Sequence, residues 1–153
     1  MATSVDTSRE DPLVGFHFKV EVTQGGITGY FTECSGLGSE NEIIEQKVVN
    51  ENGVEVVMKI PGRLKWGDIT LKRGITSNMD MWKWRKKVEQ GDVKGARSNG
   101  SIVMFDQSLV EVARWNFENG WPSKISGPSV KSDDNSIGVE ELVIVHEYIE
   151  REH

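Results

Sequence analysis

The sequence has little cysteine and no long apolar segment, and both absences limit what the chain can be. It contains a single cysteine, Cys34, among 153 residues. One cysteine excludes an internal disulfide framework and cannot by itself make a zinc site. The longest uncharged apolar runs, such as LVIV at 142–145, are far shorter than the roughly 18 residues of a transmembrane helix. We therefore expect a chain that folds by packing alone and does not insert stably into a membrane.

Positive charge is also scarce. Lys and Arg number 18 against 24 Asp and Glu, which gives a net charge of −6. Because nucleic-acid binding needs a clustered cationic face, this balance argues against specific nucleic-acid binding. Residues 1–12 lack the basic start and apolar stretch of a secretory signal, so we expect a flexible polar arm there. The remaining residues, 13–153, fit a single domain.

Motifs of catalysis and ligand binding are missing or incomplete. The sequence HEYIE at 146–150 has glutamate where a zincin needs its second histidine. The sequence SGLGSE at 35–40 lacks the third glycine of a dinucleotide loop and predicts a glycine-kinked strand or bulge. The acidic cluster at 132–141 does not have the spacing of a calcium loop. No serine, cysteine or lysine stands in a recognisable nucleophile motif. We expect no enzyme activity, cofactor or metal.

Alternating apolar residues predict strands through most of the chain. Residues 14–22 alternate as a strand with one buried face, and 27–37 read as the return strand of a hairpin. A further strand is predicted at 63–74, and a second hairpin at 101–117. The last segment, 137–149, predicts one long strand with apolar groups on both faces, so that something must cover each face.

Two segments look peripheral to this sheet. Residues 39–61 read as a protruding arm of two short strands around the turn signal Asn52-Gly53. Residues 77–90 begin with an S-x-x-D capping box at Ser77 and predict the only confident helix. The count of six to eight strands and one helix favours a closed or half-closed sheet, with the helix against an outer face.

An aromatic cluster follows the second hairpin. Trp115 and Phe117 share a strand face with Leu109 and Ala113, which predicts core packing. Trp121 precedes a proline and is expected in a loop beyond the strand. Three roles are open for these aromatic residues: the core, an intersubunit contact or a small-ligand platform.

Five phrases in order along the chain resemble a known family. They are DPLVGFHFKVEV (11–22), FTECSGLGSENEIIEQKV (31–48), KIPGRLKWGDITLKRGIT (59–76), ARWNFENGWPSKISGPSV (113–130) and VEELVIVHEYIE (139–150). The family comprises the tail tube proteins of contractile phages and of phage-derived contractile injection systems. The resemblance covers nearly the whole chain and leaves the opening arm outside it.

The resemblance implies a mainly β fold with one helix, a tail-tube-type β-barrel or sandwich whose strands join neighbouring subunits in a hexameric ring. Rings would stack into a hollow inner tube, which contraction of a surrounding sheath drives through a target envelope. The implied partners are other copies of the chain, the sheath protein, baseplate or spike and tube-terminating proteins, and a lumenal cargo of effector protein or DNA. The chain would be assembled in the cytoplasm of the producing cell and become part of a phage tail or an extracellular or membrane-anchored injection particle.

The same resemblance suggests three surfaces. The arm at 39–61 would lie at the ring-to-ring junction, with Ile43, Ile44, Val48, Val49, Val54, Val56 and Met58 as its contact residues. The subunit interface would contain Trp121, Leu142, Ile144 and Tyr148. The predicted helix at 77–90 would face the sheath through Trp82, Lys83, Lys86 and Lys87.

Two alternatives remain open at this point. One is the ring protein of a type VI secretion system, which is also a tube subunit. The other belongs to a different class, a monomeric β-barrel ligand-binding module that would use Trp115, Phe117 and Trp121.

Overall fold

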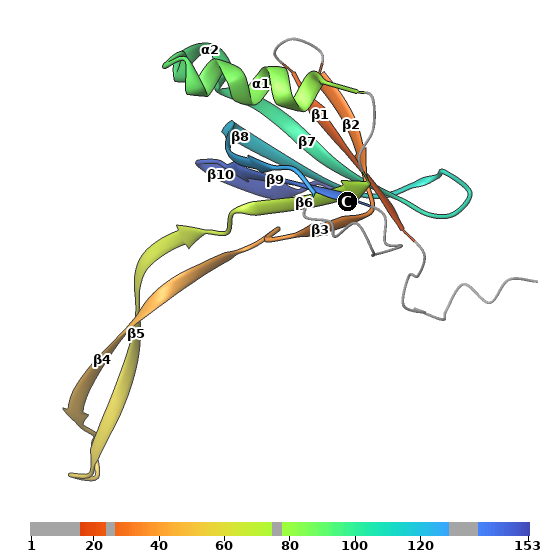
Figure 1. Cartoon of the computed structure of the whole chain (residues 1–153). Helices are drawn as coiled ribbons and strands as arrows, with labels where there is room; N and C mark the ends of the chain where they lie inside the picture. Colours follow the sequence, from red (N-terminus) through yellow and green to blue (C-terminus); the bar gives the residue numbers. More distant parts are fainter. Residues whose placement is uncertain (1–15, 24–26, 75–77, 129–137) are drawn as a thin grey trace, which may run out of the picture.

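The computed structural model describes residues 16–23, 27–74, 78–128 and 138–153, and their fold is mainly β (Figure 1). The arm predicted at 1–12 lies outside these residues. In chain order the elements are β1 (His17–Val22), β2 (Ile27–Phe31), β3 (Glu33–Ser35), β4 (Ser39–Val49), β5 (Glu55–Trp66), β6 (Ile69–Gly74), α1 (Asp80–Glu89), α2 (Val93–Ala96), β7 (Ser98–Phe105), β8 (Glu111–Ser126), β9 (Val139–Val145) and β10 (Tyr148–Arg151). The described residues thus contain more strands than expected and a second, short helix.

Eight of the strands form one curled sheet in the order β2-β1-β7-β8-β9-β6-β3, with β10 also paired to β8. Strands β2 and β3 lie at the two ends of this order and are joined by Thr32. The Thr32 N–H and hydroxyl both donate to the Lys72 carbonyl, at 2.9 and 3.2 Å. The two ends are therefore close together, but among the described residues the sheet is not closed into a barrel.

Strand β8, with 16 residues, joins two parts of this sheet. Its first part pairs with β7 and β10, and residues 121–126 pair with β9. Between the two parts, Asn119 has a φ of 52°, a left-handed conformation at which the strand bends. Residues 120–126 are therefore strand, and Trp121 lies in β8 and not in the predicted loop.

The last segment, predicted as one strand over 137–149, is divided in two. Strands β9 and β10 lie end to end along one edge of β8, and the ladder is interrupted at His146 and Glu147. At the interruption the Glu147 N–H still donates to the Glu118 carbonyl at 3.0 Å. The segment keeps its place along β8, but residues 146–147 do not belong to a strand.

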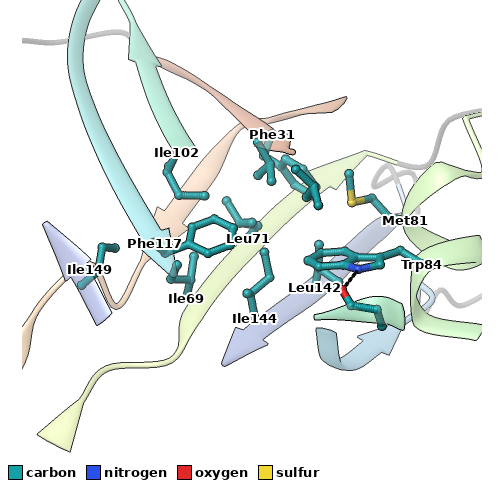
Figure 2. Packing of buried hydrophobic residues seen from close by; sticks show 13 residues of the cluster. Phe31, Ile69, Leu71, Met81, Trp84, Ile102, Phe117, Leu142, Ile144 and Ile149 are labelled. Carbon is teal, nitrogen blue, oxygen red and sulfur yellow. Dashed lines mark hydrogen bonds between the residues drawn. The ribbon is translucent and has the colours of Figure 1, made fainter. Parts of the chain in front are cut away.

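The core lies on the inner face of the curled sheet, beneath helix α1 (Figure 2). Alternate residues of several strands point into it, as the period-two pattern predicts. Helix α1 contributes Met81 and Trp84, and the Trp84 indole N–H donates to the Ala96 carbonyl at 2.7 Å. The buried members are Val20, Val22, Phe31, Ile69, Leu71, Met81, Trp84, Ala96, Ile102, Phe117, Leu142, Ile144 and Ile149.

The helices differ from the sequence prediction in their first residues. Helix α1 begins at Asp80, and its N-cap, Met79, makes no side-chain capping bond. The Asp80 N–H is instead satisfied by the Asn78 side-chain oxygen at 2.9 Å, and the expected Ser77 cap lies outside the described residues. Helix α2, which the sequence analysis did not predict, is capped by Asp92, whose side chain accepts the Gly95 N–H at 2.9 Å. Neither helix in the described part of the chain is long and apolar enough to cross a membrane.

Candidate assembly surfaces

Strands β4 and β5 form a two-stranded sheet that extends away from the body of the molecule (Figure 1). They contain 11 and 12 residues, so the hairpin, here called the arm, is longer than the two short strands predicted. At about 3.3 Å per residue, the arm reaches about 36 Å. A two-stranded ribbon on its own is marginally stable in water at best. We therefore expect the arm to be marginally stable in the isolated subunit.

The two faces of the arm differ in chemistry. Directly opposed residues share a face, and neighbours along a strand point to opposite faces. One face, here the apolar face, carries the pairs Ile44/Ile60, Gln46/Met58 and Val48/Val56. The other, the charged face, carries the pairs Ile43/Pro61, Glu45/Lys59, Lys47/Val57 and Val49/Glu55. Over the paired residues 43–49 and 55–61 the arm is thus an amphipathic ribbon whose charges lie on one side, whereas Glu42 and Lys65 form an ion pair nearer the body, at 2.8 Å.

This division sorts the residues predicted for the arm. Ile44, Val48, Val56 and Met58 lie on the apolar face, whereas Ile43 and Val49 lie on the charged face. Val54 lies in the turn at the tip, where its N–H donates to the Asn50 side-chain oxygen at 2.9 Å. The sequence placed all seven in one group because it could not fix the register of the hairpin.

The arm joins the body through a tight crossing of glycine backbones. Gly36 has a φ of 85°, and a Cβ at this position would lie 1.8 Å from the Asp68 carbonyl oxygen. The Gly67 N–H donates to the Gly38 carbonyl at 2.9 Å. The Gly38 N–H in turn donates to the Gly36 carbonyl at 3.0 Å. The predicted glycine kink at 35–40 is confirmed, and it serves as the root of the arm.

His146 contacts this root from the interruption between β9 and β10. Its Nε2 lies 3.0 Å from the Gly67 carbonyl oxygen, and its ring lies near those of Trp66 and Phe117. The Nδ1 atom is buried and has no hydrogen-bond partner among the described residues. Burial lowers the pKa of His146, although the Gly67 hydrogen bond and the nearby Asp68 charge act in the opposite direction. No group of three or more metal-binding side chains occurs in the described part of the chain.

A buried ion pair connects the sheet to helix α1, and the sequence analysis missed it. Arg73 and Glu140, which lie opposite one another on β6 and β9, are 4% and 5% exposed. The Arg73 Nε donates to Glu140 Oε2 at 3.0 Å, and the Trp82 indole N–H donates to Glu140 Oε1 at 2.9 Å. Arg73 continues the core-facing alternation of Ile69 and Leu71, so the pattern already placed a charge on the buried face.

The residues predicted to face the sheath differ in their exposure. Lys83, Lys86 and Lys87 are exposed on helix α1. Trp82 is half-buried, because its indole is bound to Glu140 at the junction between the helix and the sheet. The three lysines form an exposed basic surface, here called the helix lysines, and Trp82 positions the helix.

The residues predicted for the subunit interface also differ in their exposure. Leu142 and Ile144 are 1% and 0% exposed and pack in the core of the subunit itself. They are therefore not available to a neighbouring copy. Trp121 is half-buried opposite Val145, and Tyr148 is 40% exposed beside the Trp66 ring. Of the four, Trp121 and Tyr148 remain as candidates for an intersubunit contact.

The aromatic residues near the second hairpin do not share one surface. Phe117 is buried in the core, and Trp115 packs against the core with the Arg151 guanidinium over its ring at 5.5 Å. Trp121 lies beyond the bend of β8. Leu109, predicted to pack with them, lies in the β7–β8 turn and is 70% exposed. The three aromatic rings therefore do not form the joint ligand platform that a binding module would need.

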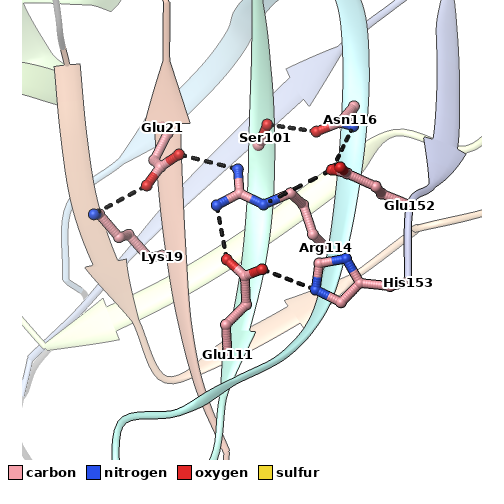
Figure 3. Close-up of polar contacts among 8 residues, drawn as sticks. All are labelled: Lys19, Glu21, Ser101, Glu111, Arg114, Asn116, Glu152 and His153. Carbon is pink, nitrogen blue, oxygen red and sulfur yellow. Dashed lines mark hydrogen bonds and ion pairs between the residues drawn. The ribbon is translucent and has the colours of Figure 1, made fainter.

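The outer face of the sheet carries a network of paired charges (Figure 3). At its centre, the Arg114 guanidinium lies 2.7 Å from Glu111 and 3.2 Å from Glu21. The hydrogen bond from Arg114 lowers the pKa of Glu111, and that from Lys19 lowers the pKa of Glu21. The further members of the network are Ser101, Asn116, Glu152 and His153. This face is polar, and its charges are bound to one another.

The sequence over residues 14–150 matches the family described as T4-like virus tail tube protein gp19. The chain belongs to this tail tube protein family. Among curated proteins, none matches the chain.

Solved structures of contractile injection systems contain chains with a similar fold. One is the PVC sheath–tube complex of an extracellular contractile injection system in the extended state, with a TM-score of 0.75, 23% identity, and coverage of 97% of this chain and 99% of that chain. Another is the tube-terminating cap of the anti-feeding prophage, with a TM-score of 0.74, 23% identity, and coverage of 97% and 95%. Hcp1 from Flavobacterium johnsoniae is similar at a TM-score of 0.56 and 12% identity, with coverage of 88% and 94%. At these low sequence identities, the similarity shows a shared fold and nothing more.

Proposed function

We propose that this tail tube protein is the inner-tube subunit of a contractile tail or contractile injection particle. Copies would form hexameric rings, and the rings would stack into a hollow tube inside a sheath. The observation that carries this proposal is the amphipathic arm. It stands away from the body with an uncovered apolar face, as a subunit that is completed by its neighbours requires.

In this proposal the arm lies at the ring-to-ring junction. Stacking buries the apolar face, while the charged face, with its Lys47–Glu55 contact at 4.0 Å, stays hydrated. Burial of apolar surface contributes about 25 cal/mol per Å², so the apolar face supplies the main attraction between rings. The ring itself would close through body contacts that include Trp121 and Tyr148.

The remaining surfaces fit the same arrangement. The outer face of the sheet, with the Arg114 network, would line the lumen, because its paired charges leave a hydrated wall with few groups free to hold a passing cargo. The helix lysines would lie on the outside and attract acidic groups of a sheath protein. Tube-terminating and baseplate or spike proteins would cover the two ends of the tube, and the cargo would be effector protein or DNA.

The test replaces residues 45–59 by an Asn-Gly turn, which joins the paired positions Ile44 and Ile60 in a short hairpin. We expect the shortened protein to form rings that do not stack, because among the described strands β4 and β5 pair with each other and not with the main sheet. Electron microscopy of wild-type and shortened protein measures rings and tube lengths. Tubes of unchanged length from the shortened protein would contradict the role of the arm. A wild-type protein that stays monomeric at high concentration, even beside its sheath protein, would contradict the tube proposal itself.

The contact of the helix lysines with the sheath has its own test. Changing Lys83, Lys86 and Lys87 to glutamine should leave bare tubes intact and weaken sheath assembly around them, most clearly at low salt, where the attraction of the wild-type lysines is least screened. Wild-type tubes mixed with the same sheath protein are the reference. Equal sheath assembly on both kinds of tube would place the sheath contact elsewhere.

A further inference from the structure

The sequence contains three Asn-Gly pairs, and all three lie in the described part of the chain. They are Asn52-Gly53 at the tip of the arm, Asn99-Gly100 in β7 and Asn119-Gly120 in β8. Such a pair can lose its side-chain amide without an enzyme, because glycine has no Cβ to hinder the attack of its own nitrogen on the asparagine. All three asparagines are exposed. Exposure therefore does not decide which pair reacts, and the local geometry has to.

The reaction requires both residues of the pair to move. The glycine nitrogen loses its proton and bonds to the asparagine Cγ, while the Cγ–Nδ2 bond breaks and ammonia leaves, which produces a cyclic imide. Water then opens the imide. Attack of water at Cγ gives aspartate, and attack at the main-chain carbonyl gives isoaspartate, in which the backbone passes through the side chain. A pair that is tightly packed or held by hydrogen bonds resists the rotation that brings nitrogen and Cγ together.

The glycines of the two pairs in the main sheet are tightly packed. A Cβ on Gly100 would lie 2.5 Å from the Glu21 carbonyl oxygen and 2.5 Å from the Phe117 ring. A Cβ on Gly120 would lie 2.5 Å from the same ring. Gly100 is also paired on both sides, with β1 and with β8. Neither glycine has room to turn toward its asparagine while the sheet stays folded.

The asparagines of these two pairs are also held. The Asn119 side-chain amide donates to Glu147 Oε2 at 2.7 Å. The Asn99 Oδ1 accepts the backbone N–H of Asn119 at 3.1 Å. A hydrogen bond to a charged group is among the stronger ones in a protein, so the need to break the Glu147 contact should by itself slow the reaction at Asn119 about tenfold or more.

The pair at the arm tip has none of these restraints. Among the described residues, no atom lies within 4 Å of a Cβ on Gly53, and none forms a hydrogen bond with the Asn52 side chain. The turn is built instead by Asn50, whose side-chain oxygen accepts the N–H groups of Asn52 and Val54 at 3.0 and 2.9 Å. The Gly53 N–H donates to the Asn50 carbonyl at 3.0 Å, and in an exposed turn water replaces such a bond at little cost.

We propose that Asn52 is a site of spontaneous deamidation, and that the fold restricts this modification to the arm tip. The tip lies at the far end of the arm from the body (Figure 1). Either product adds a negative charge beside Glu51 and Glu55. In isoaspartate the Gly53 nitrogen is joined to Cγ, so the hydrogen bond that closes the turn onto Asn50 is displaced. This chemistry goes beyond the proposed tube function and does not depend on it.

Peptide mass spectrometry tests the proposal with three sites in one molecule. Dilute wild-type protein is incubated in mildly alkaline buffer, which favours the deprotonated nitrogen, and is then digested. We expect Asn52 to lose its amide at least about tenfold faster than Asn99 or Asn119. The matched control is the same protein incubated in urea. There the three rates should become similar, because each asparagine precedes a glycine and the packing is gone.

Amide loss in the folded chain that is as fast at Asn99 or Asn119 as at Asn52 would overturn the proposal. It would also be overturned if Asn52 stayed intact in the folded chain while the urea sample reacted. Gly53→Ala provides the second measurement, because its Cβ meets no described atom and its strain is confined to the exposed turn. It should slow amide loss at Asn52 alone, and an unchanged rate would rule out attack by the nitrogen of residue 53. None of these outcomes bears on whether the chain assembles into a tube.

Discussion

The buried pair of Arg73 and Glu140 should make a single charge removal unusually costly. We expect Glu140→Gln to destabilise the subunit by about 3–5 kcal/mol, because it leaves the Arg73 guanidinium buried without a counter-charge. The substitution keeps the shape of the side chain and an oxygen that can accept the Trp82 indole N–H. Because the amide has one acceptor oxygen for these two N–H donors, the loss reports the charge together with one hydrogen bond, and not the packing.

The structure supports a value in this range because both side chains are nearly inaccessible, at 5% and 7%. For a chain of this size, such a loss corresponds to a fall in Tm of roughly 6–20 °C. Glu42→Gln is the matched control. Glu42 is 2.8 Å from Lys65, but both side chains are about half exposed, so its removal should cost less than about 1 kcal/mol.

Thermal unfolding followed by tryptophan fluorescence checks this, at one protein concentration for all variants, because assembly also stabilises the folded chain. Adding Arg73→Met to Glu140→Gln removes the unpaired cation and should recover part of the lost stability. If Glu140→Gln lowers Tm no more than Glu42→Gln, the pair does not stabilise the junction between helix and sheet.

Three further predictions concern the arm root and its surroundings. Gly36→Ala should destabilise the subunit and disturb the arm, because the added Cβ would meet the Asp68 carbonyl. The control Gly38→Ala should change Tm little, because nothing lies within 4 Å of its Cβ. Equal changes in Tm would contradict the tight crossing of the glycine backbones. Burial raises the pKa of Cys34 to about 12, so its alkylation at neutral pH should be slow in the folded chain and fast in urea; equal rates would show that the thiol is accessible. Burial lowers the pKa of His146 in the folded chain, so the unfolded chain takes up the proton first as the pH falls. The stability of the folded chain should therefore be full above the unfolded pKa of about 6.5 and decrease below it. His146→Gln should flatten this part of the stability profile against pH, and an unchanged profile would assign the pH dependence to other groups.

Local patterns were sufficient to predict much of the fold. The period-two alternation in 14–22 placed Val20 and Val22 in the core, and both are buried there in β1. The Asn52-Gly53 turn signal located the tip of the arm, where Gly53 has a φ of 75°. These features depend on residues close together in the chain, and so the sequence carries them directly.

The pairing of distant residues could not be predicted in this way. Arg73 and Glu140 are 67 residues apart, and only the register of β6 against β9 brings them together. The bend of β8 at Asn119, a non-glycine residue with positive φ, gave no turn signal that would separate it from an ordinary strand end. The two faces of the arm likewise follow from a register that the sequence leaves open.

The arm links folding of the subunit to assembly. Its two strands hydrogen-bond to each other, but no other described strand pairs with them and Ile44 and Met58 on its apolar face are about half exposed, so the arm should be among the least stable parts of the free chain. Contact with a neighbouring copy then has to supply the free energy that orders it. The glycine crossing at Gly36 and Gly67 reduces that cost, because it fixes the direction in which the arm leaves the body before any partner is met. A rigid root with a marginally stable arm lets stacking proceed between folded subunits, while a lone subunit gains little from the arm it carries.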